Sequence, residues 1–238
     1  MTQDNVLMIM NARMIDICLR SYKTLPIDRA YFTGYNEIGL ETAISKFIEK
    51  TDYRHYLLIS DDVIANKEAL VKVEEALEIV DIATGYCNIT PESPLVNLTN
   101  IKLVSEPKSI NDYHFMSRDV ADNSAYELFK TYLAGFMFTG MTRKLWQEFP
   151  FECYHNKVVM SEVVGDDVEA KTLLQEYVEE QTKEIGWGSD HCVSKKLQDA
   201  NMTISAVRGA FCEHLGGDLR LPATLVGKIK PKTTLVKY

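Results

Sequence analysis

Short apolar runs alternate with amphipathic segments along the first half of the chain. The apolar runs predict buried strands at Val6–Met10, Arg29–Thr33 and His55–Ser60. The segments that follow them place apolar residues at helical spacing and predict helices at Met14–Tyr22, Leu40–Lys50 and Lys67–Val80. This order of elements indicates right-handed crossovers between parallel strands. We therefore expect an α/β fold, a Rossmann-like single domain in which helices flank a mostly parallel central sheet.

The second half is less regular. The pattern predicts strands at Asp81–Cys87, Ala134–Met141 and Met202–Val207, and helices at Arg143–Glu148 and after Gly188. An acidic stretch at 153–184 is partly helical in period, and the basic end at 228–238 has no clear period. We expect one domain over 1–227 and a basic, solvated tail at 228–238.

Composition narrows the class of protein. Of the 238 residues 46% are hydrophobic and 25% are charged, which is ordinary for a globular protein. A formal net charge of −8 argues against nucleic acid as a partner, because a basic face supplies most of that affinity. The five cysteines are scattered and favour buried thiols in a reducing compartment. No signal peptide or transmembrane segment is evident, so the expected location is cytoplasmic.

The pair Asp61-Asp62 directly follows the third predicted strand. Ligands of open α/β sheets collect at the carboxyl ends of the strands. Two adjacent carboxylates repel each other unless they are neutralised, and Mn²⁺ or Mg²⁺ prefers such oxygen ligands together with substrate phosphates. A solvated turn with a helix cap is the ordinary alternative for such a pair.

Three further places could carry chemistry. In Gly186-Trp187-Gly188-Ser189-Asp190, the glycines allow a tight turn, Trp187 can lie against a ligand, and Asp190 stands near a helix start. Asp190 could be an N-cap, a general base, or both. His214 follows a late strand and is either structural or a metal ligand. Asn11 and Arg13 follow the first strand, where nucleotide contacts and surface solvation are both common.

In order and spacing, these residues resemble the GT-A glycosyltransferases, especially the family 2 group. The segments that carry the likeness are Asn11-Ala12-Arg13, Tyr56–Val63, Gly135–Phe138, Gly186–Asp190 and His214. The resemblance implies a GT-A-like fold, a nucleotide-sugar donor, a DxD-type metal motif and inversion at the anomeric carbon. It also implies that Asp190 is the base and that 1–227 form a catalytic domain, with a nucleotide-binding half at about 1–100 and an acceptor half at about 101–227.

By the same resemblance, the metal would be bound by Asp62, Asp61 and His214. The donor would be contacted by Asn11, Arg13, Thr33, Asp61 and Trp187. Two departures stand out. Ser60 replaces the first acid of the DxD triplet, which favours Asp62 as the direct ligand. Thr33-Gly34-Tyr35 replaces the acid that reads the base or ribose in that family.

Two rival functions stay open. A nucleotidyltransferase making a sugar nucleotide would need a glycine-rich loop after the first strand, whereas this chain has Asn11-Ala12-Arg13-Met14. A non-catalytic nucleotide- or glycan-binding protein of the same fold is consistent with Ser60. The donor sugar, the nucleotide, the oligomeric state and the acceptor, whether glycan, lipid-linked or protein, are not defined by the sequence.

Overall fold

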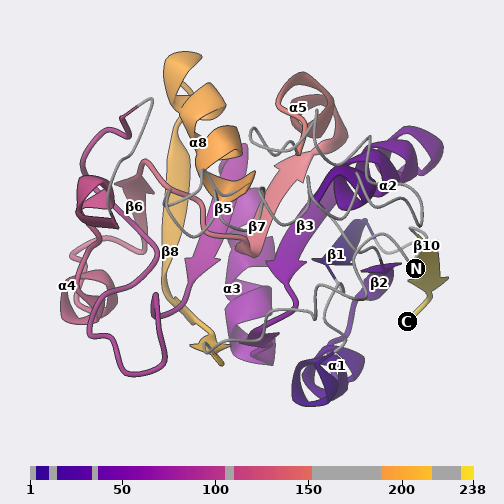
Figure 1. Cartoon of the computed structure of the whole chain (residues 1–238), viewed down its shortest axis with the longest axis horizontal. Helices are drawn as coiled ribbons and strands as arrows, with labels where there is room; N and C mark the ends of the chain where they lie inside the picture. Colours follow the sequence, from indigo (N-terminus) through magenta and orange to yellow (C-terminus); the bar gives the residue numbers. More distant parts are fainter. Residues whose placement is uncertain (1–3, 11–14, 34–36, 105–109, 152–188, 216–231) are drawn as a thin grey trace, which may run out of the picture.

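A computed structural model describes residues 4–10, 15–33, 37–104, 110–151, 189–215 and 232–238. These residues form a mixed α/β fold around one eight-stranded sheet, with strand order β10-β2-β1-β3-β7-β5-β8-β6. Figure 1 shows the sheet crossing the molecule from β6 at the left to β10 at the right. No helix among the described residues is long and apolar enough to cross a membrane.

Five of these strands run in one direction. They are β1 (Asn5–Met10), β2 (Asp28–Thr33), β3 (His55–Ser60), β5 (Ile82–Tyr86) and β8 (Ile204–Phe211). The strands that run antiparallel to their neighbours are β6 (Leu128–Thr131), β7 (Met137–Thr142) and β10 (Lys232–Val236). The expectation of parallel strands is therefore confirmed for the larger set, and β7 separates β3 from β5.

Helices cover both faces of the sheet, because successive side chains of a central strand point to opposite faces. In β1, Val6 and Met8 join one core cluster, and Leu7 and Ile9 join the other. The first cluster lies against α2 (Glu37–Lys50), α5 (Arg143–Glu148) and α8 (Ser189–Asp199). The second lies against α1 (Asp16–Lys23) and α3 (Lys67–Leu77).

Short elements complete the described fold. A two-stranded sheet joins β4 (Val63–Ile64) to β9 (Glu213–His214). A 3-10 helix (Ile110–Tyr113) and α4 (Arg118–Asp122) lie between β5 and β6 in the sequence. The helical pattern expected within 153–184 falls outside the described residues.

The end of the chain differs from the expected solvated tail. Lys232–Val236 form β10, which extends the main sheet by pairing antiparallel with β2. Lys237 and the backbone N–H of Tyr238 then hydrogen-bond to the buried carboxylate of Asp28 at 2.5 and 2.9 Å. The free edge of β2 and the buried charge of Asp28 are distant partners of this segment, and the local sequence pattern does not reveal them.

Candidate functional site

The turn Asp61-Asp62 is held at the carboxyl end of β3 by contacts on both sides. The hydroxyl of Tyr22, from α1, lies 2.8 Å from the carbonyl oxygens of both Ser60 and Val63, so that its one hydrogen is shared between them. The backbone N–H of Ser60 donates to the carbonyl of Phe136 at 3.1 Å. The pKa of Tyr22 is raised by burial and then by the charges of Cys18 and the two aspartates, which places its phenol beside the acidic turn.

Strained backbone lies next to this turn. Phe136 and Phe138, at the start of β7, have φ values of 45° and 55°, in a region that bulky residues rarely adopt. The register between β3 and β7 shifts between Leu58 and Ile59. Strain of this kind persists only where the surroundings enforce it, and it clusters at functional sites.

The structure brings Asp62 and His214 together from positions 152 residues apart. The ring Nε2 of His214 lies 3.1 Å from Oδ2 of Asp62, and the hydroxyl of Ser60 donates to Oδ1 at 2.6 Å. Pairing of β4 with β9 sets the contact, since Val63 is in register with His214. The backbone N–H of Leu215 also donates to the carbonyl of Asp62 at 2.9 Å. Only 15% of the Asp62 side chain and 18% of the His214 side chain are exposed.

This pair fits part of a site for Mn²⁺ or Mg²⁺. A carboxylate and an imidazole are suitable donors, and such ions usually complete their shell with water and substrate phosphates. Nδ1 of His214 is buried without a hydrogen-bond partner among the described residues, so one imidazole nitrogen is unused there. Within the same residues, no group of three or more His, Cys, Asp or Glu side chains is arranged to hold a metal.

Asp190 stands in the first turn of α8, where its carboxylate Oδ1 accepts the backbone N–H of His191 at 2.8 Å. Burial raises the pKa of this carboxyl above its ordinary value. A carboxylate with a raised pKa is a stronger base, while its place at a helix start favours the charged form. Because α8 begins at Ser189, Asp190 lies inside the first turn and is not the N-cap residue, although its carboxylate does accept a backbone N–H of that turn. This contact is compatible with a role as base.

Cys87 lies just beyond β5, and its thiol is influenced by the charges of both Asp62 and Asp190. Burial raises the pKa of its thiol, and the charges of Asp62, Cys212 and Asp190 raise it further. Asp62 and Asp190 therefore both lie within electrostatic reach of the same buried thiol. Sequence reasoning missed this residue, although its place after a predicted strand, like that of Asp61-Asp62, is the signal that could have identified it.

The other expected site residues are placed less completely. Asp61 is buried, with 3% of its surface exposed. Thr33 ends β2, which is separated from β3 only by β1, so the ends of these strands lie about 10 Å apart at normal strand spacing. Asn11, Arg13 and Trp187 lie outside the described residues.

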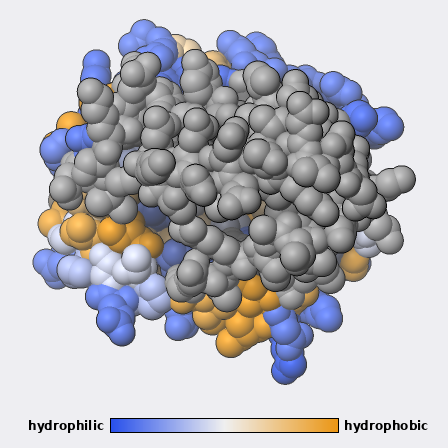
Figure 2. All heavy atoms as spheres, viewed as in Figure 1, coloured by the Kyte–Doolittle hydropathy of each residue, from blue (hydrophilic) through white to orange (hydrophobic). Residues whose placement is uncertain are grey.

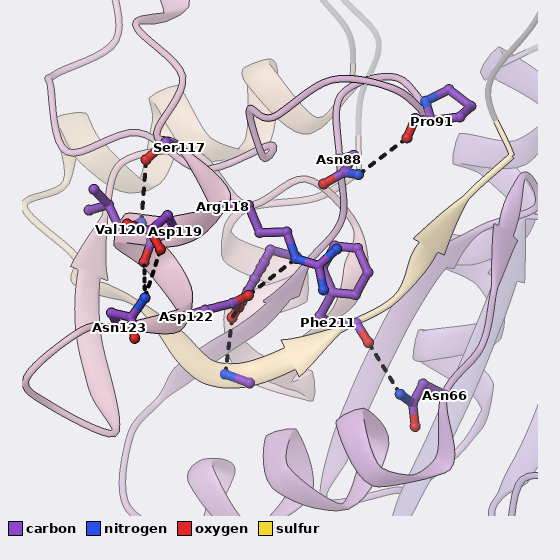
Figure 3. A network of polar contacts seen from close by, with 12 residues as sticks. Asn66, Asn88, Pro91, Ser117, Arg118, Asp119, Val120, Asp122, Asn123 and Phe211 are labelled. Atoms are coloured by element: carbon purple, nitrogen blue, oxygen red, sulfur yellow. Dashed lines mark hydrogen bonds and ion pairs between the residues drawn. The ribbon is translucent and has the colours of Figure 1, made fainter.

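A polar network borders the site on the side of β8. The guanidinium of Arg118 lies 3.7 Å from the centre of the Phe211 ring and donates to Asp122 at 3.1 Å (Figure 3). Asp122 also accepts the hydroxyl of Tyr86 at 2.5 Å, which ties α4 to the end of β5. These contacts fix the strand ends from which Cys87 and the segment leading to His214 continue.

The chain was compared with protein-family models, curated proteins and solved structures. No protein-family model matches the chain, and no curated protein matches it. Among solved structures, the crystal structure of A197 from STIV is similar with a TM-score of 0.48 and 14% sequence identity. The match covers 98% of this chain and 93% of that one. A likeness at this level says nothing about function.

Proposed function

We propose that this chain is a glycosyltransferase that moves a sugar from a nucleotide-sugar donor to an acceptor hydroxyl with inversion. The observation that carries the proposal is the contact between Asp62 and His214 at the carboxyl end of the parallel strands. These two side chains would hold a divalent cation, and Asp61 and Thr33 would face the nucleotide. The cation, when bound, supplies Lewis acidity toward the diphosphate of the donor.

Asp190 would act as the base. Its carboxylate would accept the proton of the acceptor hydroxyl while the oxygen attacks the anomeric carbon and the bond to the nucleoside diphosphate breaks. General-base catalysis is typically worth about 10²- to 10⁴-fold in rate. Two observations support this role. The pKa of Asp190 is raised, and the charges of Asp190 and Asp62 both act on the buried thiol of Cys87.

A thermal-shift screen tests donor binding. Nucleoside diphosphates and nucleotide-sugars are added with and without Mn²⁺, because a ligand that binds the native state raises the melting temperature. We expect one nucleotide class to stabilise the wild type only with the metal, and Asp62→Asn to abolish the shift. Asp81→Asn, at an exposed aspartate away from the site, should retain it.

Turnover then distinguishes the rival functions. With the donor that binds, Asp190→Asn should lower transfer at least about 100-fold and leave donor affinity nearly unchanged. Near-normal transfer by this variant would refute the assignment of the base. Release of pyrophosphate from a nucleoside triphosphate and a sugar phosphate would instead identify a nucleotidyltransferase.

A further inference from the structure

Tyr113 and Phe115 form a stack of two rings close to Asp190, and a third ring, that of His191, contacts the stack from its edge. The rings of Tyr113 and Phe115 are parallel within 2°, with centroids 5.3 Å apart. The ring of His191 meets Tyr113 edge to face, also at 5.3 Å. His114, which lies between Tyr113 and Phe115 in the sequence, has a φ of 48°, which is uncommon for a residue other than glycine. The backbone is thus held in an unfavourable conformation where the rings lie parallel.

His191 gives the stack a rigid base. Its side chain is buried, and its Nε2 lies 3.1 Å from the carbonyl oxygen of Val104, to which it can donate. Burial lowers the pKa of the imidazole, so the ring is neutral at neutral pH. A neutral ring fixed by a hydrogen bond holds Tyr113 against α8 without adding charge beside Asp190.

The stack lies within reach of the proposed base. His191 directly follows Asp190 and donates its backbone N–H to that carboxylate. Burial raises the pKa of Tyr113, and the negative charge of Asp190 raises it further. Tyr113 and Phe115 are both only half-buried, which leaves part of each ring accessible to a ligand.

We propose that the stacked pair of Tyr113 and Phe115 is a platform on whose outer face a sugar ring of the acceptor stacks, so that the acceptor is a carbohydrate. This rests on the proposed function, because the platform places an acceptor hydroxyl near Asp190. Aromatic faces carry partial negative charge, and a sugar ring presents a flat face of weakly positive C–H groups with hydroxyls at its edge. A flat platform suits that shape, whereas a lipid chain would need only apolar volume.

The test measures binding of methyl glycosides to the full chain by saturation-transfer NMR, without nucleotide or metal. The panel contains the methyl glycosides of glucose, galactose, mannose and N-acetylglucosamine. We expect at least one to bind the wild type. Phe115→Ala and Tyr113→Ala should weaken that binding about five- to tenfold, in line with the strength of aromatic contacts. Tyr113→Phe, which keeps the ring, should stay within about threefold.

Two variants serve as controls. Tyr126→Ala removes an exposed tyrosine outside the stack and should leave binding unchanged. Phe115→Leu keeps apolar volume but loses the flat face, so it should bind as weakly as Phe115→Ala even if Tyr113→Ala fails to fold. Circular dichroism checks the fold of each variant.

The outcomes separate this proposal from the proposed function. Absence of glycoside binding, equal affinity in all variants, or full binding by Phe115→Leu would each overturn the platform. Because the assay contains no donor, glycoside binding can succeed even if the nucleotide screen fails. Failure of the nucleotide screen alone would overturn the proposed function and leave a carbohydrate-binding platform.

Discussion

The hydroxyl group of Tyr22 bridges two carbonyl oxygens on either side of Asp61-Asp62, although it belongs to a helix that precedes them by almost forty residues. A turn that carries adjacent carboxylates tends to open, because the two charges repel each other. One buried donor that reaches both ends of the turn opposes that opening. In the proposed site Tyr22 would contact neither the metal nor the donor and would act by positioning Asp62.

Tyr22→Phe therefore tests positioning at the turn. It removes one oxygen, keeps the packed ring and leaves two carbonyl groups without their donor. We expect the free energy of unfolding to fall by about 1–3 kcal/mol, and Mn²⁺ affinity by about tenfold or more, as for other residues that orient metal ligands. Urea unfolding and calorimetry measure the two effects, with Tyr126→Phe as the exposed control. A loss of stability without any change in Mn²⁺ affinity would show that the hydroxyl is only structural.

The raised pKa of Asp190 predicts a pH-dependent cost in stability. The folded state holds this proton more tightly than the unfolded chain, so wild-type stability should fall relative to Asp190→Asn as pH rises. The fall begins near the ordinary carboxyl value, about 4, and ends above the folded pKa. Urea unfolding of both proteins across this range measures the difference. A difference that does not vary with pH would contradict burial of the charge.

At the scale of elements, β10 shows what the sequence pattern could not predict. Its five residues are preceded by a basic stretch and lack a long alternating pattern, so the segment resembled a solvated end. Its partner, the free edge of β2, lies two hundred residues away in the sequence. The short pair β4 and β9 was missed for the same reason, because each strand has only two residues.

Lys237 anchors β10 through Asp28. Burial by itself would raise the pKa of that carboxyl, but the hydrogen bonds from Lys237, the N–H of Tyr238 and the Tyr53 hydroxyl lower it below its ordinary value. A carboxyl with a lowered pKa stabilises the fold above its unfolded pKa, and that contribution is lost as pH falls through the folded value.

Lys237→Met should therefore destabilise the protein by about 1–3 kcal/mol at neutral pH, because it leaves a buried carboxylate short of a partner. The difference from wild type should shrink in acid, where Asp28 takes up a proton in both proteins. Lys102→Met, at an exposed lysine, is the matched control. Chemical unfolding at pH 7 and at a series of lower pH values gives the comparison. Equal stability of Lys237→Met and wild type at pH 7 would mean that the anchor contributes nothing.

At the scale of the whole molecule, the central strands were predictable because they are buried on both faces and read as continuous apolar runs. Their shared direction also made the position of Asp61-Asp62 predictable. Burial on both faces does not reveal the direction in which a strand runs. The antiparallel position of β7 between β3 and β5 was therefore not predicted. The closeness of Asp62 and His214 depends on that insertion and on the order of β5 and β8, which local patterns do not encode.

Figure 2 shows hydrophilic side chains beside the described hydrophobic patches along the lower edge of the face in view. With a net charge of −8, the molecule as a whole repels a phosphorylated substrate. A donor diphosphate would therefore need local positive charge, and a cation held by Asp62 and His214 would supply it. In the proposed site the two side chains would therefore form one functional unit, although they belong to distant parts of the sequence.

A double-mutant cycle tests that unit. Asp62→Asn and His214→Gln should each lower Mn²⁺ affinity by about tenfold or more, and the double variant should lose much less than the sum of the two free energies. The reason is that, once either side chain is replaced, the other holds the ion so weakly that replacing it as well lowers Mn²⁺ affinity little further. Calorimetric titration of Mn²⁺ measures the four affinities, and His114→Gln, at an exposed histidine, serves as the control. Additive losses would mean that the two side chains act independently, and unchanged Mn²⁺ binding in both single variants would place the ion elsewhere.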